Sequence, residues 1–189
     1  IMIEKTLVLI KPDGVSRNLI GKIISRFEDT GLKIIGMKMV QANDEIARRH
    51  YPLEEEWAKN VFEKTKKGYE AQGKKLEYKN HLELGKELQS WLCNFLKECP
   101  VIAVVFEGPH AIELVRKITG ATEPRQALPG TIRGDFSSIE SYTLANDKKR
   151  VVRNLIHASD SKETAEKEIS IWFKPEELHN YQKEIEKYF

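Results

Sequence analysis

One histidine in this sequence is well suited to chemistry. His157 follows Leu155 and Ile156, and small or polar residues occupy positions 158–161. Near pH 7 a useful fraction of imidazole is neutral, so it can attack an electrophile without first losing a proton. A strand would hold the ring still, and positioning is most of what phosphoryl transfer needs from a protein. From this spacing alone two interpretations stay open, a nucleophile or a structural histidine, and the second is the commoner case.

Glu168 is a candidate partner for this histidine. It lies beside Ala165 and Trp172, which are spaced as the buried stripe of a helix, and Ser161 stands where an N-cap is expected. A carboxylate there needs a partner, because an unpaired buried charge is costly. If Glu168 accepted one ring N–H of His157, it would fix the tautomer and leave the other nitrogen free. Periodicity alone allows a surface glutamate equally well.

Three basic residues, Lys11, Arg116 and Arg133, are candidates for binding phosphate. Arginine offers planar bidentate contacts, whereas lysine offers a point charge. Arg133 lies between Gly130 and Gly134, and glycines let the backbone approach a ligand closely. Lys11 ends an apolar stretch, at the kind of position where open α/β sheets place ligands. Each residue is a weak signal alone, since most basic side chains are merely solvated.

Hydrophobic periodicity predicts the elements that would position these side chains. Strands are predicted near residues 5–10, 32–39, 101–106 and 154–158, and helices near 20–27, 44–51, 84–96, 112–118 and 161–173. We interpret 54–86, rich in Lys and Glu, as a mostly helical insertion, and 120–153 as a long irregular connection. A small C-terminal helix is also expected. Without the insertion the order is βαββαβ, which predicts one α/β (α+β) domain, residues 1–189, with a ferredoxin-like core and a four-stranded antiparallel sheet.

Several common motifs fail or are absent. Residues 68–74 match the spacing of a phosphate-binding P-loop, but Lys75 stands where Ser or Thr would hold Mg²⁺. No apolar strand precedes this stretch, so we interpret it as a charged surface segment. The sequence has no G-x-G-x-x-G, no HExxH and no paired-cysteine spacing. We therefore expect no dinucleotide fingerprint and no dedicated metal cage.

Composition excludes few functions. The formal net charge is +2, so no strong field draws the whole chain to nucleic acid or to a membrane. No apolar stretch approaches the roughly 20 residues that span a bilayer, and the N-terminus lacks a signal-peptide pattern. Cys93 and Cys99 are predicted to be small core residues, not a disulfide or a metal site. We expect a cytoplasmic protein.

Four stretches in the chain, taken together, resemble the nucleoside diphosphate kinase family. They are KTLVLIKPDGV (5–15), PGTIRGDF (129–136), NLIHASDS (154–161) and AEKEISIWFKPEE (165–177). The resemblance implies a ferredoxin-like core and a ping-pong reaction. A nucleoside triphosphate such as ATP would phosphorylate a histidine, and a nucleoside diphosphate would then remove the phosphoryl group. It also implies Mg²⁺ as the cofactor, held mainly by the nucleotide phosphates and not by a protein metal site, and a homo-oligomer, usually a hexamer.

The resemblance also implies roles for individual residues. His157 resembles the phosphorylated residue, Glu168 its orienting partner, and Ser159 a support for the hydrogen bonds around them. Phosphate and transition-state contacts are implied at Lys11, Tyr51, Arg116, Thr122 and Arg133. Asn154, together with Lys11, resembles the ribose contact. The base would meet Val151 and, at a position where the family commonly has a stacking aromatic residue, Leu88. Such apolar contacts imply weak selectivity among bases.

Two departures from the family pattern stand out. The segment 54–86 is longer than usual, and a second insertion, about 138–150, enlarges the loop before Asn154. A different function on the same fold is a nucleotide- or nucleic-acid-binding regulatory module. It is motivated by basic residues in the first insertion: Lys64, Lys66, Lys67, Lys74, Lys75 and Lys79. We favour a solvated face balanced by neighbouring glutamates, so nucleic acid is not the expected partner.

Overall fold

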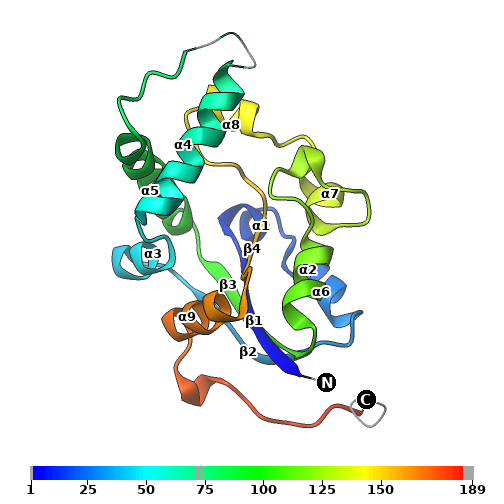
Figure 1. Cartoon of the computed structure of the whole chain (residues 1–189). Coiled ribbons are helices and arrows are strands. Elements are labelled where there is room, and N and C mark those ends of the chain that lie inside the picture. Colours follow the sequence, from blue (N-terminus) through cyan, green and yellow to red (C-terminus); the bar gives the residue numbers. More distant parts are fainter. Residues whose placement is uncertain (1, 71–72, 74, 185–189) are drawn as a thin grey trace.

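A four-stranded antiparallel sheet forms the centre of the fold. The computed structural model describes residues 2–70, 73 and 75–184. Within them the strands are β1 (Ile3–Ile10), β2 (Lys33–Val40), β3 (Val101–Pro109) and β4 (Ile156–Ala158), in the spatial order β2-β3-β1-β4. Each neighbouring pair is antiparallel. This is the ferredoxin-like topology, so the predicted fold class is confirmed (Figure 1).

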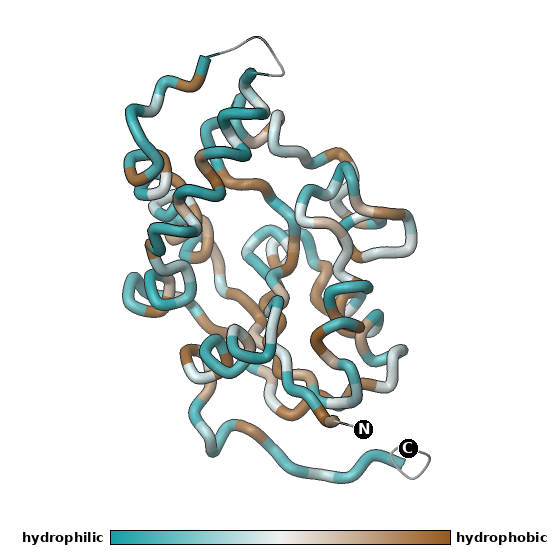
Figure 2. The backbone as a smooth tube through the Cα atoms, viewed as in Figure 1, coloured by the Kyte–Doolittle hydropathy of each residue, from teal (hydrophilic) through white to brown (hydrophobic). Residues whose placement is uncertain are grey.

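The two central strands are buried on both faces, which explains their continuous apolar sequence. In β1, Leu7 and Leu9 belong to one hydrophobic core cluster, whereas Val8 and Ile10 belong to the other. The residues of β3 alternate between the two clusters in the same way. Figure 2 shows the hydrophobic residues gathered in these strands. A rigid, doubly covered β1 therefore carries Lys11 at its end.

Helices cover both faces of the sheet. Helices α2 (Ile20–Glu28) and α6 (Ala111–Thr119) pack on one face, while α3 (Asp44–His50), α5 (His81–Lys97) and α9 (Lys162–Trp172) pack on the other (Figure 1). The hydroxyl of Ser161 accepts a hydrogen bond from Thr164 N–H, so the predicted N-cap of α9 is confirmed. Among the described residues, no helix combines the length and apolar character needed to cross a membrane.

Three short segments differ from expectation. Residues Pro12–Ser16 form a short helix, α1, in place of a simple turn. The connection 120–153 is not wholly irregular, because it holds a 3-10 turn, η1 (Pro124–Gln126), and helices α7 (Ile132–Ser137) and α8 (Tyr142–Asp147). After α9 the structure describes a 3-10 turn, η2 (Pro175–Glu177), and the small C-terminal helix expected from the sequence falls partly on residues 185–189, outside the described residues. Helices of fewer than two turns are too short to leave a periodic pattern, and only α7 and α8 among these segments have side-chain N-caps, Thr131 and Ser141.

Helix α4 (Glu55–Glu70) occupies the first half of the segment that we interpret as an insertion. It packs along α5, where buried Ala58 meets Gly85: a methyl group added to Gly85 would lie 2.9 Å from the Cβ of Ala58. Helix α5 then begins at His81, with Asn80 as its N-cap. The P-loop-like spacing starts at Gly68 inside α4, so it is not a loop that follows a strand. Residues 71, 72 and 74 of that motif lie outside the described part of the chain.

Candidate active site

His157 is positioned by the short edge strand β4, which pairs with β1 so that His157 lies opposite Leu9. Its side chain is 22% exposed. The Nε2 atom is buried and lies 2.8 Å from Oε1 of Glu168 on α9, although the two groups are not aligned as a regular hydrogen bond. The other oxygen, Oε2, accepts a 2.5 Å hydrogen bond from the hydroxyl of Ser159. The carboxylate is thus fixed on one side and holds the imidazole on the other.

A second histidine lies behind the first. His50 ends α3, and its ring meets the His157 ring edge to face, with centroids 4.4 Å apart. Its Nδ1 accepts a hydrogen bond from the indole N–H of Trp172. Burial, together with the nearby His157 and Lys11, lowers the pKa of His50 well below its ordinary value. His50 is therefore neutral at physiological pH and packs as a rigid wall behind His157.

Lys11 and Asn154 form the next part of the site. The Lys11 amine donates a 2.6 Å hydrogen bond to Oδ1 of Asn154, whose own amide donates to the carbonyl of Thr122. This chain links the end of β1 to the connection after α6. Burial and the neighbouring Arg133 lower the pKa of Lys11 to about 8, although Asp13 opposes the shift. Within the described part of the chain, no carboxylate is hydrogen-bonded to the Lys11 amine, so its charge is available to an anionic ligand.

Arg133 is buried near the start of α7 and is held by backbone carbonyls. Its guanidinium donates hydrogen bonds to the carbonyl oxygens of Asn154, Gly120 and Ile156. Because guanidinium has five N–H donors, donors remain beyond these three. The orientation of the group is thereby fixed before any ligand binds. A preorganised cation of this kind suits a phosphate.

A strained residue precedes His157. Leu155 has a φ of 67°, in the left-handed region that a leucine rarely adopts, and it is fully buried. Its N–H donates to the carboxylate of Asp13, and its carbonyl accepts from the N–H of Lys11. These two bonds offset the strain, which costs about 1–2 kcal/mol. They also fix the turn between Asn154 and His157, so Asp13 positions the site, a role that no local sequence pattern predicts.

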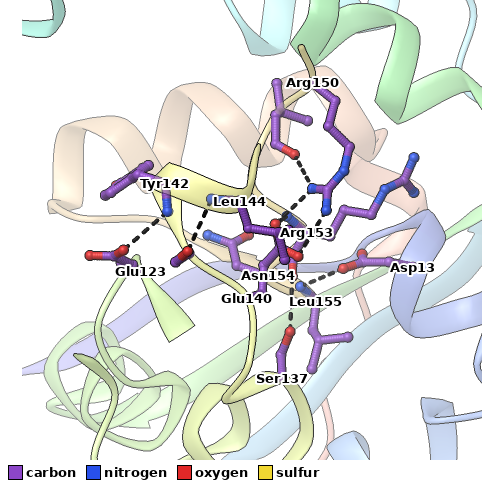
Figure 3. A network of polar contacts seen from close by, with 12 residues as sticks. Asp13, Glu123, Ser137, Glu140, Tyr142, Leu144, Arg150, Arg153, Asn154 and Leu155 are labelled. Carbon is purple, nitrogen blue, oxygen red and sulfur yellow. Dashed lines mark hydrogen bonds and ion pairs between the residues drawn. The ribbon is translucent and has the colours of Figure 1, made fainter. Parts of the chain in front are cut away.

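A second polar network fastens α8 beside the site, and Figure 3 shows its members pointing toward one another. Buried Glu140 accepts two hydrogen bonds from the guanidinium of Arg150 and one from the N–H of Arg153. Burial opposes ionisation of Glu140, but the bonds from Arg150 and Arg153 prevail and lower its pKa. Glu123 accepts a bond from the N–H of Tyr142 at the start of α8. Hydrogen bonds therefore hold the chain both before and after α8.

The predicted site residues converge on one cavity of about 830 Å³. Ten of them line it: Lys11, Tyr51, Leu88, Arg116, Thr122, Arg133, Val151, Asn154, His157 and Glu168. Ser159 does not line the cavity and instead lies buried behind Glu168. Tyr51 keeps its proton, because burial and the charge of Glu168 raise its pKa. The volume falls within the usual range of small-molecule sites.

Sequence reasoning missed several residues that shape the site. Asp13 and Glu140 act through backbone groups distant in sequence, so no local spacing reveals them. A role for His50 in the site could have been suspected, because it stands one residue before Tyr51. Its contact with Trp172, on the apolar stripe of α9, is visible only in the structure. The helix α4, taken as a solvated insertion, places Trp57 and Tyr69 in the lining of the cavity.

Fold and site together define a class of protein: a ferredoxin-like domain whose histidine, held by a glutamate, faces a cavity with several cationic side chains. That is the arrangement expected of a phosphoryl-transferring enzyme. Comparison with known proteins identifies the family. The family model of nucleoside diphosphate kinase matches residues 4–73 and 69–178. The chain belongs to the nucleoside diphosphate kinase family.

Individual relatives agree with this assignment. The nucleoside diphosphate kinase of Pyrobaculum aerophilum is 46% identical over 180 residues, which cover 93% of this chain and 98% of that protein. The crystal structure of an NDP kinase from the same organism has a TM-score of 0.90 and 43% identity, and the match covers 95% of this chain and all of the other. A transition-state mimic of the Borrelia burgdorferi enzyme, with bound vanadate and ADP, has a TM-score of 0.79 and 39% identity, with coverage of 97% and 95%. The predicted enzyme class, nucleoside diphosphate kinase, is confirmed.

Proposed function

We propose that His157 is the residue that carries the phosphoryl group in a ping-pong reaction. The observation that supports this most directly is the contact of Nε2 with Glu168, because it leaves Nδ1 as the ring nitrogen available to a ligand. The Nδ1 lone pair attacks the γ-phosphorus of a nucleoside triphosphate, a P–N bond forms, and the bond to the β-phosphate oxygen breaks. A diphosphate oxygen of the second nucleotide then attacks the same phosphorus, and the P–N bond breaks.

The cationic side chains stabilise the charge that develops during both steps. Arg133 is preorganised by its three carbonyl contacts, and Arg116 lies exposed in the last turn of α6, where it lines the same cavity. Lys11 and Asn154, which are hydrogen-bonded to each other, both contact the ribose hydroxyls. The proton of Tyr51 is available to a phosphoryl oxygen. Electrostatic stabilisation of this kind is the main contribution a protein makes to phosphoryl transfer.

Mg²⁺ arrives as part of the nucleotide substrate in this proposal. Magnesium prefers oxygen ligands and usually binds through one or two carboxylates together with substrate phosphates. Among the residues that line the cavity, the carboxylate of Glu168 is engaged by Ser159 and His157, that of Glu123 accepts hydrogen bonds from Tyr142 and Gln126, and Asp160 is an exposed carboxylate. These donors fit a metal held by the nucleotide itself. The ion would neutralise phosphate charge, while the protein side chains orient the phosphates.

Steady-state kinetics test the proposal. With ATP and a second nucleoside diphosphate varied together, a ping-pong enzyme gives parallel double-reciprocal lines, because the first product leaves before the second substrate binds. Intersecting lines would indicate a direct transfer between two bound nucleotides and would contradict a phosphorylated His157. Weak discrimination among acceptor bases is expected, since Val151 and Leu88 offer apolar contact only.

We further propose that the chain is a single domain that acts as a cytoplasmic hexamer. Exposed apolar side chains at Met37 and Met39 on the edge strand β2, and at Leu128 and Ile139 on the connection, support association between copies. Both cysteines are free thiols, which agrees with a reducing compartment. Sedimentation equilibrium gives the oligomer size directly, and a monomer at micromolar concentration would contradict the hexamer.

A further inference from the structure

One face of α4 lines the cavity along the whole helix. The residues that contribute are Trp57, Val61, Lys64, Thr65, Gly68 and Tyr69. Their spacing of three or four residues places them on a single face of an α-helix. The exposed lysines Lys66 and Lys67 of the same helix do not line the cavity. The segment that looks like a solvated insertion is therefore two-sided, with one face turned to solvent and another to the site.

Helix α4 is held at a fixed distance from the cavity. Ala58 is fully buried against Gly85 of α5, and this close contact leaves no room for a side chain at Gly85. The facing side of α5 supplies Leu88 and Leu92 to the same cavity. Two packed helices thus form one continuous wall.

The direction of α4 orders its residues along the cavity. Trp57 also lines a smaller cavity of about 220 Å³ together with His50 and Glu168, so the N-terminal end of α4 lies near the catalytic pair. Tyr69 is twelve residues further on, about 18 Å along the helix axis at a rise of 1.5 Å per residue. Figure 1 shows that the C-terminal end of α4 is the end farther from β4, and Tyr69 lines the cavity together with Tyr142 and Thr143 of α8. Tyr69 therefore faces the end of the cavity away from His157.

We propose that α4 is a wall of the nucleotide site and that the ring of Tyr69 contacts the nucleobase. The inference rests on the proposed function, in which the phosphates point toward His157 and the base lies at the opposite end. Leu88 and Val151 contribute aliphatic surface to the cavity, Tyr142 of α8 is an exposed ring on the same lining, and Tyr69 adds a half-buried aromatic ring. Aromatic side chains bind bases by stacking without selecting among them, because every base presents a π face.

The test compares a ligand that has a base with one that lacks it. Calorimetry on the full chain would measure ADP and inorganic triphosphate binding to wild type, Tyr69→Ala and Tyr69→Phe. Loss of a stacking ring should weaken ADP binding about fivefold or more. Tyr69→Phe keeps the ring and should stay within about twofold of wild type. Inorganic triphosphate should bind wild type and Tyr69→Ala equally, because it has no base. Lys67→Ala, on the solvent face of α4, is the matched control and should change neither ligand.

Each outcome decides the inference. Unchanged ADP binding in Tyr69→Ala, or an equal loss for both ligands, would overturn the base contact, and circular dichroism would verify that the variant is folded. Phosphoenzyme formation by wild type is measured separately with saturating MgATP. If wild type forms no phosphoenzyme while ADP binding still depends on Tyr69, the result contradicts the phosphoryl-transfer proposal and supports the base contact. If wild type binds neither ligand, the result contradicts both proposals.

Discussion

Oε1 of Glu168 lies 2.8 Å from Nε2 of His157, while its second oxygen accepts a hydrogen bond from Ser159. The carboxylate thus connects the histidine on the edge strand β4 with a hydroxyl two residues further along the chain. Because Nε2 is turned toward α9, the opposite side of the ring faces the cavity. The contact with Glu168 therefore leaves Nδ1 as the ring nitrogen that can attack a phosphorus atom.

Glu168→Gln should slow phosphorylation of His157. The amide cannot stabilise the positive charge that imidazole acquires during attack. Polar contacts to charged groups contribute about 1.5–3 kcal/mol, which corresponds to a rate loss of roughly 10- to 150-fold. Rapid-quench measurement of the first turnover with MgATP gives this rate. Ser159→Ala leaves the carboxylate in place and should cost less. An unchanged rate in Glu168→Gln would show that the contact is only structural.

Nucleotide affinity should weaken above about pH 8. The pKa of Lys11 is lowered to about 8 in the free protein, so its amine loses charge as the pH rises through that value. Bound phosphate favours the charged form, and binding therefore takes up a proton. KM should rise with pH while kcat at saturation changes less. Lys11→Gln should bind weakly at every pH and lose this dependence. A wild-type KM that stays flat to pH 9.5 would contradict the shift.

The same pKa shift has a consequence for folding stability. An ordinary lysine in the unfolded chain titrates near 10.4, so between about pH 8 and 10 the unfolded state binds more protons than the folded one. The contribution of Lys11 to stability should therefore increase with pH in this window. Urea unfolding at pH 8 and 10, compared between wild type and Lys11→Gln, isolates it. A difference that falls with pH would have the wrong sign.

Asp13→Ala should destabilise the fold and disturb the turn before His157. The substitution removes the acceptor of the buried Leu155 N–H while the backbone keeps its left-handed strain. An unsatisfied buried donor costs about 1–3 kcal/mol in the free energy of unfolding. Denaturant titration measures this loss. Asp13→Asn is the matched control, because its amide oxygen can still accept the bond. Equal stability of the Ala variant and wild type would show that Leu155 relaxes without Asp13.

Glu140→Gln should loosen the loop that carries α8. Arg150 loses its bidentate carboxylate, and we expect roughly 2–3 kcal/mol lower stability, since a partly buried pair is broken from one side. KM for nucleotide should rise severalfold, because Val151 and Asn154 lie one and four residues after Arg150 in the same segment. Asp147→Asn, at an exposed position on α8, serves as the control. If Glu140→Gln changed stability but not KM, the network would support the fold alone.

The sequence was most informative where local physics decides the structure. The apolar residues of β1 and β3 predicted central strands, and Ser161 marked the start of α9, because burial and capping act over a few residues. The cationic candidates could also be assembled before the structure was known, since the family motifs carry them. Lys11, Arg133 and Asn154 indeed meet around one cavity.

What the sequence could not predict depends on contacts between distant segments. The left-handed conformation of Leu155 is stabilised by Asp13, 142 positions away in sequence, which accepts a hydrogen bond from its N–H, and by the N–H of Lys11, which donates to its carbonyl. Helices α7 and α8 are too short to have a periodic signature. The two-sided character of α4 was hidden as well, because lysines and glutamates dominate its composition and only packing on α5 reveals which face meets the site.

His157 is proposed to carry the phosphoryl group, and identification of the labelled residue tests this proposal. The protein is incubated with MgATP labelled at the γ-phosphate, quenched in alkali, digested and analysed by mass spectrometry. We expect an acid-labile, base-stable label on the peptide containing His157, which is lost on addition of GDP with formation of labelled GTP. Folded His157→Ala should take up no label. A label on another residue, or a folded wild-type protein that is never labelled, would contradict the account.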